Sequence, residues 1–424
     1  MNRYFIRMLV RESGERLPVL CTRESGMPLF YPTCFALSHL RNSGQASATL
    51  EQALRSVMAL QLILDRSRID LFSRLNEGRI LEQWEVEEAM RQASSPLREL
   101  AAVAISPVDL NATYVIYLPG PGEGAKPLGN SLHRRSLSVR LVYIRSYLNW
   151  IAELWIGRMR RAGSPELGRQ LEAAQKRVSA QLGTRIPRSR SRTTLKQREG
   201  LSTKDKVRLL EVVRPESPDN PWTSHHGRAR NRLVVELLLK LGCRRGELLG
   251  LRTADVNFAT GVIRIVRKAD DKNDPRPYEP NTKTSDREVM LGNELTSLLK
   301  SYVQVDRRSL KGARKHGFIF VANGSGAPLS LSGLAKVFAA LRNECPDLPS
   351  ELSPHVLRHT WNDDFSEHCD RENISNEEEA QLRNYAMGWA PDSLTSQVYL
   401  RRHTREQSKK VSLKMQGDLI RNAT

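Results

Sequence analysis

Two short stretches decide the fold class of the second half of this chain: GVIRIV at residues 261–266 and REVMLG at residues 287–292. Both are rich in β-branched and long apolar side chains, which is typical of strands. A polar stretch with three prolines before residue 281 separates them, and FIFV at 318–321 predicts a third strand. Helical patterns flank these runs, from residue 201 and again from residue 330. The second half is therefore predicted to be α+β, mainly helical with a small sheet.

The first two hundred residues are predicted to be mainly helical. Apolar residues recur at three- and four-residue spacing over 46–64, with Thr49 as the candidate helix cap. Helices are also indicated at 81–93 and 138–155. Before them, RYFIRMLV at 3–10 and RLPVL at 16–20 flank ESGE, and this pattern predicts an N-terminal hairpin.

The composition indicates a polyanionic partner. The 424 residues, 39% of them hydrophobic, are enough for two or three domains with their own cores. The formal net charge is +19 at pH 7, and no long apolar run or signal-peptide pattern predicts a membrane location, so nucleic acid is the expected partner. The five cysteines lack metal-ligand spacing and suit a reducing cytoplasm, so we expect no structural metal.

Residues 183–200, GTRIPRSRSRTTLKQREG, carry six basic side chains against one acidic side chain and show no apolar periodicity. This composition is typical of a linker. The stretch is either a solvated tether or a segment that binds along a phosphate backbone, and we favour the second interpretation. The candidate DNA-binding residues are Arg185, Arg188, Arg190, Arg192, Lys196 and Arg198.

Four polar islands stand out after the linker: LGCRRGELLGL from 241, NTKTSDREVML from 281, PHVLRHTW from 354 and MGWAPDSLTSQVYLRR from 387. In PHVLRHTW the two histidines are four residues apart, as in a zinc-binding helix. The arginine between them and the missing glutamate argue against zinc. A pair of hydrogen-bonded histidines beside a capping arginine is the simpler structural interpretation.

Together the islands supply arginines, a lysine, histidines and a tyrosine, a set that suits phosphoryl transfer. Guanidinium groups can bridge two oxygens of a phosphodiester and stabilise the charge that develops in displacement. The leaving oxygen needs a proton, which Lys283 or His355 can deliver. A tyrosine must lose its own proton before it attacks, because its ordinary pKa is about 10.

The first two islands resemble catalytic segments of the tyrosine recombinases, also called the phage integrase family. GCRRGEL resembles the first box, which implies a catalytic role for Arg244 and a supporting role for Glu247. TKTSDREVML resembles the turn and strand that carry the family's lysine, which implies Lys283. The polar stretch before this turn is longer than in many members of the family.

The last two islands resemble the second and third boxes of the same family. HVLRH matches the second box in full, which implies direct roles for His355 and Arg358 and a supporting role for His359. MGWAPDSLTSQVY resembles the third box, which implies catalytic roles for Trp389 and for the nucleophile Tyr399. The separation of these two residues is one residue longer than the commonest family spacing.

The resemblance covers roughly residues 230–405 and implies an antiparallel sheet within the catalytic domain. It implies four parts: an N-terminal hairpin or arm at 1–30, a helical core DNA-binding domain at 31–182, a basic linker at 183–200, and a catalytic domain with a C-terminal tail at 201–424. In this family the two domains form a C-shaped clamp around DNA.

The implied function is site-specific recombination or integration for a bacterial mobile element, through a 3′-phosphotyrosine intermediate and without metal, ATP or another cofactor. The implied partner is double-stranded DNA with a specific site, bound by a homotetramer that is a monomer or dimer when free. The implied location is the bacterial cytoplasm, at the nucleoid when DNA is bound. The alternatives are a DNA-relaxing enzyme like type IB topoisomerases, a catalytically silent DNA-binding protein of the same fold, and a basic helical nucleic-acid binder with coincidental motifs.

Overall fold

The computed structural model describes residues 3–102, 131–187, 200–280, 284–391, 393, 408 and 411–415. The chain divides into two compact units, the first made of Met1–Arg11 and Glu15–Thr193 and the second of Glu12–Gly14 and Thr194–Thr424. Each unit has its own hydrophobic core. The predicted fold class, mainly helical with small antiparallel sheets, is confirmed. No helix in the described ranges has the length and hydropathy needed to span a bilayer.

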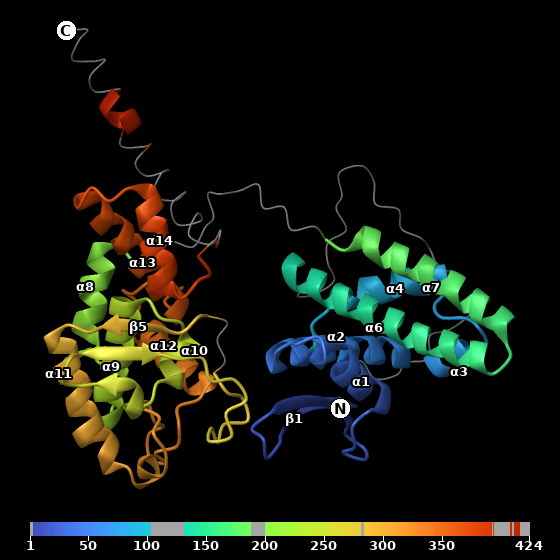
Figure 1. Cartoon of the computed structure of the whole chain (residues 1–424), viewed down its shortest axis with the longest axis horizontal. Helices are drawn as coiled ribbons and strands as arrows, with labels where there is room; N and C mark the ends of the chain where they lie inside the picture. The colour runs from blue at the N-terminus through green and yellow to red at the C-terminus, as the bar shows by residue number, and fades with distance from the viewer. Residues whose placement is uncertain are drawn as a thin grey trace. The chain divides into compact units, whose positions relative to one another are not determined.

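The first unit combines a β-hairpin with helices (Figure 1). Its described elements are β1 (Tyr4–Val10), β2 (Arg16–Thr22), α1 (Phe30–Cys34), the π-helical η1 (Phe35–Arg41), α2 (Ser47–Arg66), α3 (Leu71–Asn76), α4 (Gln83–Ala93), α5 (Leu97–Ala102), α6 (Arg134–Arg161) and α7 (Pro165–Arg185). The two strands pair antiparallel, from Tyr4 opposite Thr22 to Val10 opposite Arg16. β2 is buried along most of its length and packs on α2, so the hairpin shares the core of the helices.

α2 is central to the first unit because its sequence is apolar on most sides. Eleven of its 20 residues are buried, and it packs against β2, α4 and α6. The predicted helices at 46–64, 81–93 and 138–155 are confirmed as α2, α4 and α6. The prediction that Thr49 caps the first of these is wrong, because α2 already begins at Ser47 and Thr49 lies in its first turn.

The second unit packs helices around a three-stranded sheet (Figure 1). Its described elements are α8 (Thr203–Val212), α9 (His225–Leu241), α10 (Arg245–Gly250), the 3₁₀ turn η3 (Thr253–Asp255), β3 (Val256–Asn257), β4 (Val262–Ile265), β5 (Arg287–Met290), α11 (Asn293–Ser301), the π-helical η4 (Tyr302–Arg307), the 3₁₀ helix η5 (Lys311–Lys315), α12 (Leu331–Glu344), α13 (Pro354–Arg371) and α14 (Asn376–Met387). α9 is buried over most of its length and packs against α10 and α13. Helix α9 therefore packs against both α10, in the first predicted box, and α13, which carries the second predicted box.

The sheet has the order β3-β4-β5, with antiparallel pairing throughout. β4 and β5 confirm the two predicted strands. The prediction of a third strand at 318–321 is wrong: Phe318 and Val321 form only isolated bridges, and the third strand is the short β3. Ile319 donates its backbone N–H to Leu251 at 2.9 Å, so this stretch is apolar because it crosses the core outside the sheet.

Candidate active site

The turn between α9 and α10 joins the first and second predicted boxes. α9 ends at Gly242, whose φ of 58° lies in the left-handed region that glycine favours. A Cβ at this position would lie 2.7 Å from the ring of Trp361 on α13, so glycine permits the close approach of that helix. The carbonyl of Gly242 accepts a hydrogen bond from Nη1 of Arg358 at 2.6 Å. Arg358 is thereby fixed beside the start of α10.

Arg244 is the residue immediately before α10, and its side chain is 36% exposed. Its Nη1 lies 3.5 Å from Oε1 of Glu247 and 3.4 Å from the carbonyl oxygen of Met387. The adjacent Arg245 is exposed to solvent. Of the two neighbouring arginines, Arg244 is therefore the one held near the end of α14 while part of its guanidinium stays accessible to an anion.

Glu247 is a buried carboxylate that accepts hydrogen bonds from three parts of the chain. The donors are the backbone N–H of Arg244 at 2.9 Å, the hydroxyl of Thr284 at 2.6 Å, and Nη2 of Arg287 at 2.8 Å. Burial alone would raise the pKa of Glu247, but Arg287 and the other donors outweigh it and hold that pKa below its usual value. The carboxylate is therefore a charged anchor between α10 and β5.

Arg358 connects the second predicted box to the third. Its side chain is buried, and its guanidinium carbon lies 5.4 Å from the centroid of the Trp389 ring, in cation–π geometry. The backbone N–H of Trp389 donates to the carbonyl of Asn384 at 2.8 Å, which fixes the tryptophan at the end of α14. One face of the Arg358 guanidinium is thus covered by an aromatic ring.

Gly388 brings the third predicted box against the turn before β5. Its φ is 63°, and a Cβ would lie 2.7 Å from Nη1 of Arg287 and 2.9 Å from the carbonyl oxygen of Ser285. The carbonyl of Gly388 accepts the backbone N–H of Ser285 at 3.0 Å. The segments that contain Arg244, Thr284 and Trp389 therefore meet around one buried salt bridge.

His355 and His359 face each other on the first turns of α13. Their Nε2 atoms are 3.1 Å apart, and their ring centroids are 4.4 Å apart in an edge-to-face arrangement. The ring that accepts this hydrogen bond must be neutral at Nε2. Within the described residues no group of three or more His, Cys, Asp and Glu side chains is arranged to hold a metal ion.

Several predicted site residues lie outside the described residues. These are Lys283, Tyr399 and five of the six basic linker residues: Arg188, Arg190, Arg192, Lys196 and Arg198. The sixth, Arg185, ends α7 and forms an exposed ion pair with Glu87 at 3.0 Å.

Four buried polar side chains that connect the elements of this region were not predicted from the sequence. Thr284 and Arg287 bind Glu247, and a fully buried ion pair between Arg383 and Glu379 connects α14 to Ser366 of α13. A weak signal was available for Arg287, since it shares the inward face of β5 and a buried arginine needs an acidic partner.

The described side chains define a cationic site at which α10, α13 and the segment after α14 meet. Residues 219–405, which include all of these elements, match the family model described as "Phage integrase family". Through this region the chain is similar to the tyrosine recombinase, or phage integrase, family.

Curated relatives of the same family align with part of the chain. Tyrosine recombinase XerD of Halalkalibacterium halodurans is 30% identical over 132 residues, which are 31% of this chain and 39% of that protein. Tyrosine recombinase XerD of Ralstonia nicotianae is 28% identical over 196 residues, 41% of this chain and 58% of that protein. The chain thus spans well under two thirds of the length of these relatives.

Solved structures of similar proteins include XerH bound to a palindromic difH substrate, a post-cleavage complex, with a TM-score of 0.40 and 18% identity. That match covers 84% of this chain and 94% of XerH. The Tn1549 transposon integrase in complex with circular intermediate DNA has a TM-score of 0.39 and 17% identity, with 64% of this chain and 91% of that chain covered. TM-scores of this size do not establish a shared arrangement of whole chains.

Proposed function

We propose that this chain is a site-specific DNA recombinase that cleaves and rejoins duplex DNA through a 3′-phosphotyrosine intermediate. The observation that carries the proposal is the placement of Arg358, bound to the Gly242 carbonyl and covered by Trp389, next to the α10 turn that presents Arg244. Two guanidinium groups held in one place suit the oxygens of a phosphodiester. This placement lies inside the matched family region, residues 219–405.

The covalent step is a displacement at phosphorus. The phenolic oxygen of Tyr399 passes its proton to His355 and bonds to the scissile phosphorus, while the bond from phosphorus to the 5′ oxygen breaks. The 5′ oxygen leaves as a hydroxyl after it takes a proton from Lys283, with His355 in a second proton-transfer role. A 5′ hydroxyl of a partner duplex then attacks the adduct and releases the tyrosine. The phosphodiester bond energy is kept in the adduct, so the proposal invokes no ATP or other cofactor.

Arg244 and Arg358 stabilise the negative charge that develops on the phosphate oxygens. Arg358 is rigid because its Nη1 is bound to a backbone carbonyl and its face packs on a tryptophan. Arg244 is held through the same α10 turn, whose backbone is bonded to Glu247. Donors that are fixed before the reaction need no reorganisation during it, which is the usual origin of such electrostatic stabilisation.

The proposed partner is double-stranded DNA, in keeping with the formal net charge of +19. We infer that the helical first domain and the catalytic domain hold a duplex as a clamp, with the basic linker along the backbone. Recombination then brings together two duplexes and four protomers. Without DNA the protein is a monomer or a dimer. In the tetramer, the tail beyond residue 405 docks on a neighbouring protomer. We further propose that the protein serves a bacterial mobile element and acts in the cytoplasm, at the nucleoid when DNA is bound.

Fragments of the DNA that flanks the chain's own coding region provide the test substrates. We expect an SDS-stable protein–DNA adduct at one mapped position, and recombination between two copies of that site. Arg244→Ala and Arg358→Ala should lower cleavage by about 10²- to 10³-fold while binding changes little, because these donors act in the transition state.

Other outcomes would contradict the proposal. Relaxation of supercoiled plasmid without recombination would favour the topoisomerase alternative. Site-specific binding without an adduct would favour a catalytically silent protein. Normal synaptic tetramers on a native gel after removal of residues 406–424 would exclude docking by the tail.

A further inference from the structure

Asn384 lies in the last turn of α14 and binds the segment that follows the helix at two points. The side chain is buried, with 5% of the residue exposed. Its backbone carbonyl accepts the N–H of Trp389 at 2.8 Å, and its Nδ2 donates to the carbonyl of Pro391 at 2.8 Å. Any residue supplies the carbonyl, but the second bond needs a short side chain with an N–H donor. Asn384 therefore holds both ends of the segment 389–391.

The place of this segment decides how the guanidinium of Arg358 is oriented. Nη1 of Arg358 donates to the carbonyl of Gly242 at 2.6 Å, which fixes one edge of the planar group. The ring of Trp389, with its centroid 5.4 Å from the guanidinium carbon, covers one face. A hydrogen bond at one edge leaves the plane free to tilt, and the aromatic ring removes that freedom.

The two helices that carry these residues are joined below the ring by a second buried asparagine. Asn362, on α13, is 0% exposed, and its Nδ2 donates to the backbone carbonyl of Arg358 at 2.8 Å and lies 3.7 Å from Sδ of Met387. Met387 is the last residue of α14 and is fully buried. The end of α14 is thus packed on α13 independently of the segment 389–391. Loss of the Asn384 amide should displace that segment and leave the helices in place.

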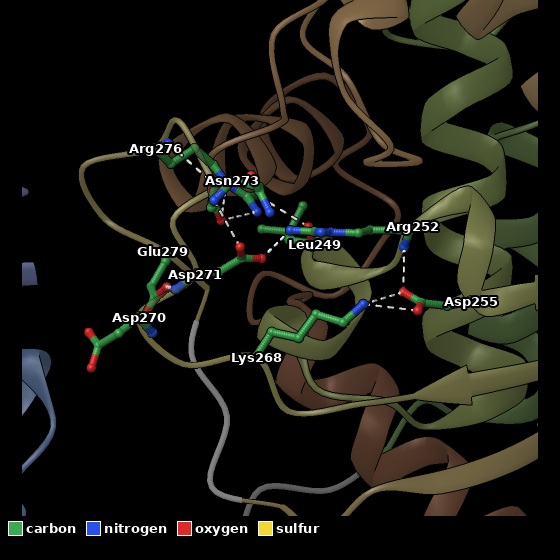
Figure 2. A network of polar contacts seen from close by, with 10 residues as sticks. Leu249, Arg252, Asp255, Lys268, Asp270, Asp271, Asn273, Arg276 and Glu279 are labelled. Atoms are coloured by element: carbon green, nitrogen blue, oxygen red, sulfur yellow. Dashed lines mark hydrogen bonds and ion pairs between the residues drawn. The ribbon is translucent and has the colours of Figure 1, made fainter. Parts of the chain in front are cut away.

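The part of the site that carries Arg244 is held by several bonds at once. Three donors bind Glu247 in the first turn of α10. In the last turn of the same helix, the carbonyl of Leu249 accepts a hydrogen bond from Nη1 of Arg276 at 3.1 Å (Figure 2). Removing the amide of Asn384 breaks none of these bonds, so Arg244 should stay in place.

The other end of the Asn384 amide group favours a role beyond packing. Its Oδ1 is buried and has no hydrogen-bond partner among the described residues. A buried acceptor without a partner lowers stability, so the fold by itself would favour an apolar side chain of the same size at this position. What the asparagine adds is the bond to Pro391.

We propose that Asn384 is a positioning residue for charge stabilisation. Its amide holds the segment 389–391 so that Trp389 covers Arg358, and the covered guanidinium keeps one orientation toward the scissile phosphate. The inference rests on the proposed function and adds one residue that acts through two others.

Asn384→Leu is the main variant, because leucine has a similar volume and removes both the donor and the buried acceptor. Asn384→Ala removes the same groups without adding apolar volume and serves as a second variant. Asn220→Leu is the matched control. Asn220 lies before α9 in the same unit, is 6% exposed, and donates its Nδ2 to the carbonyl of Arg214 at 2.9 Å.

Single-turnover cleavage is measured on a duplex that carries the mapped site, with each rate taken from the time course scaled to its own final amount of adduct. Unfolded protein then lowers the amount and not the rate. Both Asn384 variants should be slower than the wild type by about 10- to 100-fold, because a displaced donor loses much of its effect in the transition state. Asn220→Leu should be within about threefold of the wild type, since it lies outside the site.

The decisive measurement repeats Asn384→Leu in two backgrounds, Trp389→Leu and Arg358→Ala. If Asn384 acts through these two residues, its replacement should slow cleavage by less than about threefold once either of them is absent. A defect in folding, or in another part of the site, would multiply with the loss already present in each background.

Several results would overturn the inference. These are a full 10- to 100-fold loss from Asn384→Leu in either background, wild-type rates for both Asn384 variants, and an equal loss in Asn220→Leu. Failure of both Asn384 variants to fold would make the residue structural and would overturn it as well. If the wild-type chain forms no adduct, the proposed function itself fails. An adduct in the wild type with multiplying losses refutes the inference alone.

Discussion

Replacing Arg287 by methionine removes one half of a buried charge pair. The side chains of Arg287 and Glu247 are each 1% exposed, and the guanidinium lies 2.8 and 3.2 Å from the two carboxylate oxygens. Methionine keeps an apolar stem but leaves the carboxylate with only the longer, 3.5 Å contact to the partly exposed guanidinium of Arg244. Removing one partner of such a pair costs about 3–5 kcal/mol, and we expect about 3 kcal/mol because the Arg244 N–H and the Thr284 hydroxyl remain as donors.

The size of this loss should depend on pH. In the wild type the pKa of Glu247 is held below its ordinary value despite burial, so the carboxylate stabilises the fold above pH about 4.3 and loses this effect as the pH falls through the folded-state pKa. Without Arg287, burial dominates and raises that pKa. The variant then gains stability from protonated Glu247 at low pH and loses it as the pH rises. The difference between the two proteins is therefore largest near pH 7 and shrinks toward pH about 4.

Urea unfolding followed by hydrogen exchange of α9 peptides measures this effect in the second unit. Arg169→Met is a matched control, because the Arg169 and Glu166 side chains are 68% and 67% exposed, and it should change stability by less than about 0.5 kcal/mol. Adding Glu247→Leu to Arg287→Met should recover much of the loss, since an apolar pair removes the unpaired charge. A loss below about 1 kcal/mol, or one that is constant from pH 7 to about 4, would refute the reasoning.

Two further predictions test the packing around the site. Cys243 is buried, and burial raises its pKa to about 12. Iodoacetamide at pH about 8 should therefore leave Cys243 unmodified while the partly exposed Cys34 reacts. Equal labelling of the two cysteines in native-state mass spectrometry would contradict this prediction. Gly388→Ala places a Cβ 2.7 Å from Nη1 of Arg287, whereas Gly44→Ala has a similar φ of 78° and no heavy atom within 4 Å. The first should lower stability by about 1–3 kcal/mol more than the second in urea unfolding, and equal losses would show that backbone strain alone matters.

The sequence predicts the parts of this site whose residue types the chemistry restricts. The motif HVLRH predicts two histidines and an arginine on one helix, and in the structure the Nε2 atoms of those histidines are 3.1 Å apart. The arginine of that motif, Arg358, binds the turn that precedes α10, as expected if the first and second boxes act together. Motif order carries this information because Arg244, Arg358 and Trp389 lie in distant segments of the sequence, and the described structure brings these three segments together.

The remaining features depend on which side of an element faces inward. Arg287 and Thr284 look like ordinary residues of a polar turn and strand, and only the fold shows that they bind a buried carboxylate. The polar stretch before them has the composition of an exposed loop, yet Asp274 and Arg276 are each 6% exposed because their charges cancel in a pair. Conversely, residues 318–321 have the apolar composition of a strand because they are buried in the core, but Phe318 and Val321 form only isolated bridges.

The most direct test of the central claim is mass spectrometry of the trapped protein–DNA adduct after protease and nuclease digestion. We expect one nucleotide-bearing peptide, with the 3′ phosphate esterified to Tyr399, and its disappearance in Tyr399→Phe while DNA binding persists. A 3′ phosphate attached to any other side chain, or an adduct that persists in Tyr399→Phe, would contradict the account.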